Sequence, residues 1–247
     1  IPNEPMLAFL HAANKVALYG PLWIMLTAVP HFLGMGSLLI TLFTFKLFII
    51  AWYFVLCYLI WIASGRKPWG LAFFALNPLV TLSTLVDGHN DVVMMALALG
   101  SFLMLKRSRF LLSLLFLLAS ILIKGATLFL IPVFFWSAYA IWNKKTLSWQ
   151  HVWYWASAAM YMIFLLSPIR EEIYAWYFIW PLTFLALVDK PTILHAASYG
   201  FSLGLMLRIV PFFYTRSWSG VTPLVKKIVT FVPPIISLLF YGKTRRR

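Results

Sequence analysis

Long apolar runs, each separated from the next by a short polar loop, occupy most of this sequence. A helix needs roughly 20 residues to cross about 30 Å of hydrocarbon, and only helices or closed barrels satisfy their backbone hydrogen bonds there. The runs do not alternate apolar with polar residues, which excludes a barrel. Since 63% of the residues are hydrophobic and 11% are charged, one water-soluble core cannot hide the apolar surface. The sequence therefore predicts an all-α, polytopic transmembrane helical bundle.

The hydropathy pattern predicts about nine or ten spans in a single domain that covers residues 1–247. The expected spans are 35–63, 70–86, 91–105, 110–124, 126–142, 151–168, 174–189, 192–213 and 221–241. A shorter apolar run that ends near His31 fits a tilted span or a re-entrant segment, and residues 4–18 fit a helix lying in the interface. The chain begins with Ile1 and not with Met, so we expect it to be a fragment of a longer protein.

The charges of the loops sort them onto two faces. Twenty Lys and Arg against six Asp and Glu give a net charge of +14. If every run crosses once, one face receives most of the basic loops, and the positive-inside rule makes that face cytoplasmic. These loops are 66–67, 106–109, 144–145, 189–190 and 243–247. Basic residues placed in this way meet anionic lipid headgroups, so membrane lipids and not nucleic acid are the expected partners. The single Cys57 excludes a disulfide framework.

Four of the six acidic residues fall in two tight clusters on the opposite face. Asp87 and Asp91 flank one turn, and Glu171 and Glu172 follow Arg170 in another. A charged side chain at membrane depth costs several kcal/mol unless it is paired or wetted, so acids beside long apolar runs indicate a functional site. We expect this site on the non-cytoplasmic face, in a cavity walled by the 87–91 turn, the start of the 126–142 span and the aromatic segment 174–180.

The turn from Asp87 to Asp91 has three interpretations. Asn90 or Asp91 can cap the following helix by accepting its free backbone N–H groups. Together with Asp87 and His89, they can instead bind sugar hydroxyls, because carboxylates accept hydrogen bonds while an imidazole or an amide both donates and accepts. Carboxylate oxygens also suit a divalent cation, but one His among five residues does not specify a metal site. No cofactor is expected, and a divalent cation stays open.

Several basic and aromatic residues near this face also have two interpretations. Lys124 is either a lysine that snorkels to the interface or a phosphate ligand, and Arg170 either pairs with Glu171 or Glu172 or binds phosphate. The aromatic side chains of the next segment belong to an interfacial belt, or stack on sugars and line a groove for isoprenoid tails. They are Tyr174, Trp176, Tyr177 and Trp180. Deeper in apolar runs, Lys46, Arg208 and His195 need a partner or a wet cavity.

Taken in order, several short motifs resemble the GT-C superfamily of integral-membrane glycosyltransferases. The motifs are Tyr19-Gly20-Pro21-Leu22-Trp23, Asn77-Pro78-Leu79, Gly88-His89-Asn90-Asp91, Ile123-Lys124, Ser167-Pro168, Trp176-Tyr177 and Trp180-Pro181. The likeness covers positions 19 to about 190, and its most specific part runs from Asn77 to Lys124. Within the superfamily, the chain most resembles the polyprenyl-phosphate-mannose-dependent mannosyltransferases of bacteria and archaea.

This resemblance implies an inverting hexosyltransferase with a GT-C-like fold in a prokaryotic plasma membrane. Such an enzyme moves a sugar, here mannose, from a polyprenyl-phosphate donor to a glycan or lipid acceptor outside the cell. The family's general base is usually an Asp in the first long outer loop, so we expect the base, the first span and that loop to precede residue 1. Lys124 and Arg170 would then serve the phosphate, while His89 and Asp91 would hold sugar or acceptor.

Two other functions stay open on the sequence alone. A secondary transporter could use Asp87, His89 or Lys46 in an ion relay, although transporters tend to keep such groups near the midplane within repeated halves. No internal repeat is visible in this chain. The third alternative is a non-catalytic scaffold or paralogue.

Overall fold

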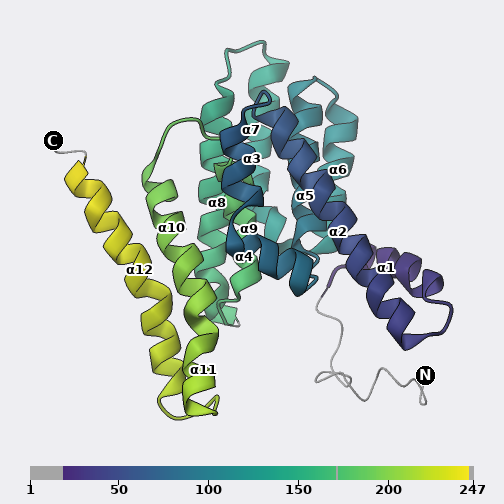
Figure 1. The fold of residues 1–247 in the computed structure, drawn as a ribbon. Helices are drawn as coiled ribbons and strands as arrows, with labels where there is room; N and C mark the ends of the chain where they lie inside the picture. Colours follow the sequence, from purple (N-terminus) through teal and green to yellow (C-terminus); the bar gives the residue numbers. More distant parts are fainter. Residues whose placement is uncertain (1–18, 171, 245–247) are drawn as a thin grey trace.

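Helices make up the molecule, which is described by a computed structural model over residues 19–170 and 172–244, apart from the side chains of Arg170 and Thr244. Within those ranges there is no strand (Figure 1). The α-helices are α1 (Pro21–Leu33), α2 (Leu38–Ala63), α3 (Pro68–Ala75), α4 (Pro78–Thr81), α5 (Asp91–Lys106), α6 (Phe110–Ile123), α7 (Ile131–Trp142), α8 (Trp149–Arg170), α9 (Ile179–Leu185), α10 (Ile193–Met206), α11 (Val210–Thr215) and α12 (Thr222–Thr244). Shorter helical segments are η2 (Leu82–Val86), η3 (Gly125–Leu130), η4 (Ala175–Phe178) and η5 (Leu207–Ile209).

The all-α fold and the multi-pass membrane class are confirmed, but the number of long spans is lower than expected. Five helices of the described chain are long and apolar enough to cross a membrane. They are Leu38–Ala63, Gly125–Trp142, Trp149–Ile169, Ile193–Thr215 and Thr222–Lys243. A bent pair of helices raises the number to six, compared with the nine or ten predicted from hydropathy. The interfacial helix expected over residues 4–18 lies outside the described residues.

Helix α5 shows why hydropathy overestimates the count. It has 16 residues, about 24 Å of helix, and it packs against α2, α6, α7 and α9. Most of its side chains are buried, among them Val92, Met95 and Phe102 at 0% exposure. An apolar helix that faces protein on all sides has the same composition as one that faces lipid. The apolar sequence of α5 is therefore explained by burial within the bundle, and by itself it does not indicate contact with a membrane.

The expected span over residues 70–86 is broken in the middle. Helices α3 and α4–η2 meet at Asn77 and Pro78 with a bend of 57°. The proline ring disfavours helical backbone at the preceding residue, and the Asn77 side chain completes the break. Asn77 Oδ1 accepts the Leu79 amide hydrogen at 3.0 Å, while its Nδ2 donates to Ser202 on α10 at 3.0 Å. The break thus fixes the segment that leads into the turn at Asp87.

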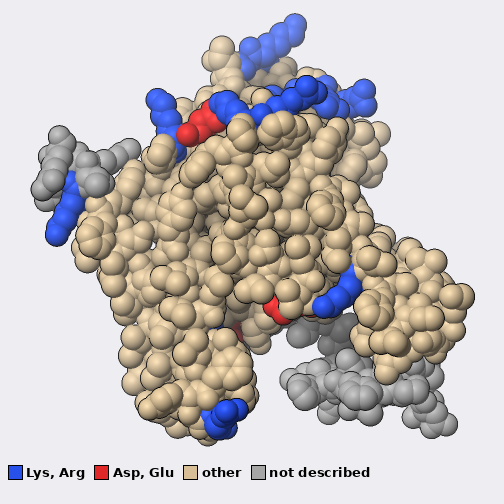
Figure 2. Space-filling view, in the orientation of Figure 1, with Lys and Arg blue, Asp and Glu red and all other residues tan. Residues whose placement is uncertain are grey.

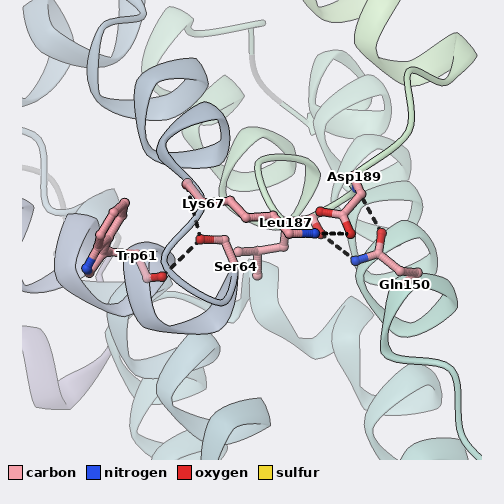
Figure 3. A network of polar contacts seen from close by, with 6 residues as sticks. All are labelled: Trp61, Ser64, Lys67, Gln150, Leu187 and Asp189. Carbon is pink, nitrogen blue, oxygen red and sulfur yellow. Dashed lines mark hydrogen bonds and ion pairs between the residues drawn. The ribbon is translucent and has the colours of Figure 1, made fainter.

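Polar contacts join the loops of one end of the bundle, which lies uppermost in Figure 1. Lys67 pairs with Asp189 at 2.7 Å, and Gln150 binds both the Leu187 carbonyl and the Asp189 amide (Figure 3). Lys106 lies over the ring of Trp149, next to Gln150. In Figure 2, Lys and Arg side chains gather over this end. The loops after α2, α5, α7 and α9 therefore share one face, as the loop charges predict.

Candidate functional site

The turn between η2 and α5 lies at the end of the bundle opposite the loops joined around Lys67 and Asp189. The Asp87 amide donates to the Leu82 carbonyl at 2.9 Å, and the His89 amide donates to the Ser83 carbonyl at 3.1 Å. Between them Gly88 has φ +74°, a left-handed conformation that favours glycine. Asn90 occupies the N-cap position of α5, but its side chain makes no capping hydrogen bond. Capping therefore does not account for the polar side chain of Asn90.

Asp91 lies in a buried cluster behind this turn. Its side chain is fully buried, and its Oδ1 accepts hydrogen bonds from Lys124 Nζ at 3.0 Å and from Trp180 Nε1 at 2.5 Å. The other oxygen, Oδ2, and the amide nitrogen of Asn90 have no hydrogen-bond partner among the described residues. Buried polar atoms left unpaired lower stability, so they call for a reason other than stability. This cluster is the first indication of a functional site at this end.

Lys124 reaches Asp91 from a break between two helices. Its backbone is extended, with φ −161° and ψ 128°, so α6 ends and η3 begins on either side of it. The preceding carbonyl, of Ile123, accepts the Gly20 amide hydrogen at 3.0 Å. Only a glycine allows this approach, since a Cβ on Gly20 would lie 2.1 Å from the Leu122 oxygen. Gly20, just before α1, therefore packs directly against the end of α6, at the break where Lys124 lies.

Two aromatic stacks cover the cluster. The Lys124 ammonium lies 4.2 Å from the ring centre of Tyr177 and 5.1 Å from that of Trp180, and these two rings stack at 4.4 Å. In the second stack, Trp176 lies between Tyr174 at 4.6 Å and His89 at 3.7 Å. The 174–180 segment therefore contacts Lys124 through Tyr177 and Trp180, and contacts His89 through Trp176.

Burial lowers the pKa of His89. The Asp91 and Asp87 carboxylates act in the opposite direction, and the Lys124 ammonium acts in the same direction as burial. The neutral imidazole is therefore favoured against the Trp176 ring, where it can donate one hydrogen bond and accept another.

A cavity of about 640 Å³ lies in front of the stacks. Its polar lining consists of Ser83, Asp87, Glu172, Tyr174, Trp176, Arg208 and Lys226. Its apolar lining includes Leu79, Leu82, Ile173, Leu205, Met206, Ile209 and Trp218. Asp87 is exposed, and its side chain makes no hydrogen bond or ion pair with any described residue. The cavity therefore combines an unpaired carboxylate, two cations and an apolar lining.

The two cations meet at Glu172. Lys226 Nζ lies 2.5 Å from Glu172 Oε1, and Arg208 donates to the same oxygen. Arg208 also donates to Thr230 Oγ1 at 2.9 Å, and Lys226 lies over the ring of Trp218 at 4.9 Å. Helices α10 and α12 pack along each other, and this packing brings Lys226 beside Arg208 of η5. A second cavity, of about 690 Å³, borders the same three charged residues and reaches Lys227 and Phe231.

The residues predicted from the sequence fall into two groups in space. Asp87, Tyr174 and Trp176 line the cavity, with His89 stacked behind Trp176. Asn90, Asp91, Lys124 and Tyr177 form the buried cluster, and Lys124 lines neither of these two cavities. Glu171 and the Arg170 side chain lie outside the described residues.

The third wall of the cavity differs from the expected one. We expected the start of the 126–142 span, but residues 205–209, Trp218 and Lys226 line the cavity instead. The sequence indicated Arg208 only as a charge that needs a partner, and it gave Lys226 no place in a site. The signal that could have found them is a cation within an apolar run.

The described residues do not bring together three or more His, Cys, Asp or Glu side chains in a way that could hold a metal ion. Of the three such groups in the 87–91 turn, Asp87 lines the cavity, His89 stacks on Trp176, and Asp91 lies in the buried cluster. The arrangement fits the binding of a phosphorylated, partly apolar ligand by cations and aromatic rings.

Comparison with known proteins gives the family. Searches of curated proteins and of solved structures each return no significant match. The profile of the alpha-(1->6)-mannopyranosyltransferase N-terminal domain, from the MptA_B family, matches residues 12–140, just over half of the chain. The match includes the turn at Asp87 and the break at Lys124. It favours a glycosyltransferase over a transporter, with a sugar donor and a glycan acceptor as substrates. This chain belongs to the alpha-(1->6)-mannopyranosyltransferase family.

Proposed function

We propose that this protein transfers mannose from a polyprenyl-phosphate donor to a glycan or lipid acceptor, with inversion at the anomeric carbon, in the manner of the GT-C superfamily. One observation carries the proposal: a single cavity combines two mostly buried cations, an unpaired carboxylate and an apolar wall. A sugar linked to a long lipid through phosphate needs all three. Because its polyprenyl chain stays in the bilayer, such a donor also suits an enzyme built from apolar helices.

Arg208 and Lys226 are assigned to the donor phosphate. Their side chains are 12% and 14% exposed, so their charges act at reduced dielectric. During transfer, the acceptor oxygen forms a bond to the anomeric carbon, the electron pair of the carbon–phosphate oxygen bond moves to the phosphate, and the acceptor proton leaves to a general base. The phosphate gains negative charge in this step. Two fixed cations stabilise that charge as it develops, which lowers the barrier.

Asp87, Tyr174 and Trp176 are assigned to the sugar. A carboxylate accepts hydrogen bonds from sugar hydroxyls, and aromatic faces pack on the apolar faces of pyranose rings. His89 supports Trp176 from behind. Asp91, Asn90, Lys124 and Tyr177 position the 174–180 segment. Arg170 and Glu171, which directly precede Glu172 in the sequence, are proposed to contribute to substrate binding as well.

The site is proposed to open on the non-cytoplasmic side of a prokaryotic plasma membrane. The loops joined around Lys67 and Asp189 lie at the other end of the bundle and carry most of the loop cations. Positive loops remain in the cytoplasm. The end that holds Asp87 and Glu172 would then face outward.

A donor comparison tests this function. Membranes that carry the full-length protein are supplied with radiolabelled mannose on polyprenyl phosphate or on a nucleoside diphosphate, and transfer to acceptor is measured. We expect transfer from the lipid donor alone, and we expect Asp87→Asn to lower it by about tenfold or more because one hydrogen bond to the sugar is weakened. Transfer from the nucleotide donor without any lipid-linked intermediate would contradict the proposal.

A further inference from the structure

The two cations assigned to phosphate both pair with a carboxylate of the chain itself. Glu172 Oε1 accepts from both Arg208 and Lys226. We infer that Glu172 is an internal counter-ion that holds the phosphate position while the cavity is empty, and that it leaves both cations when phosphate binds. This inference rests on the proposed function.

The exposures of the three side chains identify the partner that moves. Glu172 is 48% exposed, whereas Arg208 and Lys226 are 12% and 14% exposed. A half-exposed carboxylate recovers its hydration when it turns into water. The buried cations cannot, so leaving them unpaired would be strongly destabilising. They also have fixed second contacts, to Thr230 and to the Trp218 ring. Exchange of the Glu172 carboxylate for a phosphate therefore costs less free energy than leaving the two cations unpaired.

The charges of the reaction fit such an exchange. With Glu172 in place the three side chains carry a net charge of +1, and without it the two cations carry +2. The donor is a phosphodiester with one negative charge, while the leaving polyprenyl phosphate is a monoester with about −1.5 to −2 at neutral pH. The vacated pair of cations thus complements the charge that develops during transfer. The return of Glu172 then competes with the product, which favours its release.

Glu172 borders two cavities, so its side chain has space into which it can move away from the cations. The first cavity contains Asp87 and Trp176, and the second contains Lys227 and Phe231. Both are bordered by Glu172, Arg208 and Lys226. A rotation of the Glu172 side chain toward the second cavity would bring it near Lys227, which supplies another cation on that side.

The test uses farnesyl phosphate as a short lipid phosphate, with farnesol and inorganic phosphate as separate ligands. Binding to the purified full-length protein in zwitterionic detergent is measured by calorimetry for the wild type, Glu172→Gln, Arg208→Gln and the control Asp189→Asn. Asp189 pairs with Lys67 at the other end of the bundle. We expect Glu172→Gln to bind farnesyl phosphate about tenfold more tightly, because its carboxylate no longer competes. Asp189→Asn should bind as the wild type does.

The outcomes separate the two proposals. If Arg208→Gln leaves farnesyl phosphate binding unchanged, or if farnesol binds equally well, the phosphate site itself is wrong. If Arg208→Gln abolishes binding but Glu172→Gln fails to tighten it, the site stands and the counter-ion role is overturned. Equal gains for inorganic phosphate and farnesyl phosphate would assign the exchange to the phosphate group alone and support the inference. Glu172→Ala repeats the test in case Glu172→Gln is poorly folded, and must show the same gain.

Discussion

Lys124 Nζ lies 3.0 Å from Asp91 Oδ1, and the two residues join the start of α5 to the break between α6 and η3. The Asp91 carboxylate is fully buried, and the Lys124 side chain is 17% exposed. Both groups therefore gave up most of their hydration to form this pair. Trp180 and Tyr177 complete the cluster, which makes the pair a support for the aromatic segment in front of it.

Removing either member of this pair should destabilise the protein. Lys124→Met and Asp91→Asn are each expected to cost about 3–5 kcal/mol, because the remaining group stays buried without its partner. The thermal midpoint of the purified protein measures the loss. Lys67→Met, at the exposed pair with Asp189, should cost at most about 1 kcal/mol. A double variant, Asp91→Asn with Lys124→Met, should lose less than the sum, and strictly additive losses would show that the two residues do not interact.

Stability should depend on pH through His89. Burial lowers the pKa of His89 in the folded protein, against about 6.5 when unfolded. The unfolded chain then binds more protons between these two values, so stability from neutral His89 is fully present above about pH 6.5 and is lost as pH falls through the folded-state pKa. Thermal midpoints compared at about pH 7.5 and about pH 5 should show a smaller drop in His89→Phe than in the wild type. His151→Phe, at an exposed position of α8, should keep the full drop; if both variants behave alike, His89 is not responsible.

The close contact between Gly20 and α6 leaves no room for a side chain at position 20. A Cβ there would lie 2.1 Å from the Leu122 oxygen, so Gly20→Ala must shift the segment that seals the break before Lys124. We expect a loss of about 1–3 kcal/mol, measured by thermal denaturation. Gly242→Ala is the matched control, since a Cβ on this residue of α12 would meet no other atom within 4 Å. A Gly20→Ala protein as stable as Gly242→Ala would refute this packing.

Labelling of single cysteines should place the two ends of the bundle on opposite sides of the membrane. In a Cys57→Ala background, Ser219→Cys lies in the loop beside the cavity and Asn143→Cys lies among the basic loops, and both positions are exposed. A membrane-impermeant maleimide applied to intact cells should label position 219 and should reach position 143 only after permeabilisation. The reverse pattern would put the cavity in the cytoplasm and remove the proposed outer-face reaction.

Local signals in the sequence predicted the fold class and the sorting of the loops. Charges between apolar runs placed Lys67, Lys106 and Asp189 at one end, and the structure brings their loops together. The number of spans was overestimated, because composition cannot distinguish a helix buried in protein, such as α5, from one that faces lipid. The bend at Asn77 and Pro78 divides a run that hydropathy treats as continuous.

The site was predicted less completely, because its key contacts join distant positions. Asp91 and Lys124 are 33 residues apart, and Glu172 and Arg208 are 36 apart. The sequence indicated that Arg208 needs a partner, but nothing local identifies Glu172 as that partner. Lys124 was expected at the phosphate, and its ammonium instead lies against Asp91 and two rings. Pairing of this kind depends on how the helices pack, which a single sequence does not specify.

The most direct test of the account is the donor KM of Arg208→Gln. If Arg208 holds the donor phosphate, its loss removes a charge-assisted hydrogen bond of about 1.5–3 kcal/mol, which corresponds to a rise of roughly ten- to hundredfold in the KM for polyprenyl-phosphate mannose. Lys67→Gln removes a cation from the other end of the bundle and should leave this KM unchanged. The full-length variants are assayed in membranes at matched protein level with the lipid donor varied. Equal donor KM values for Arg208→Gln, Lys67→Gln and the wild type would contradict the assignment of this cavity to the lipid phosphate.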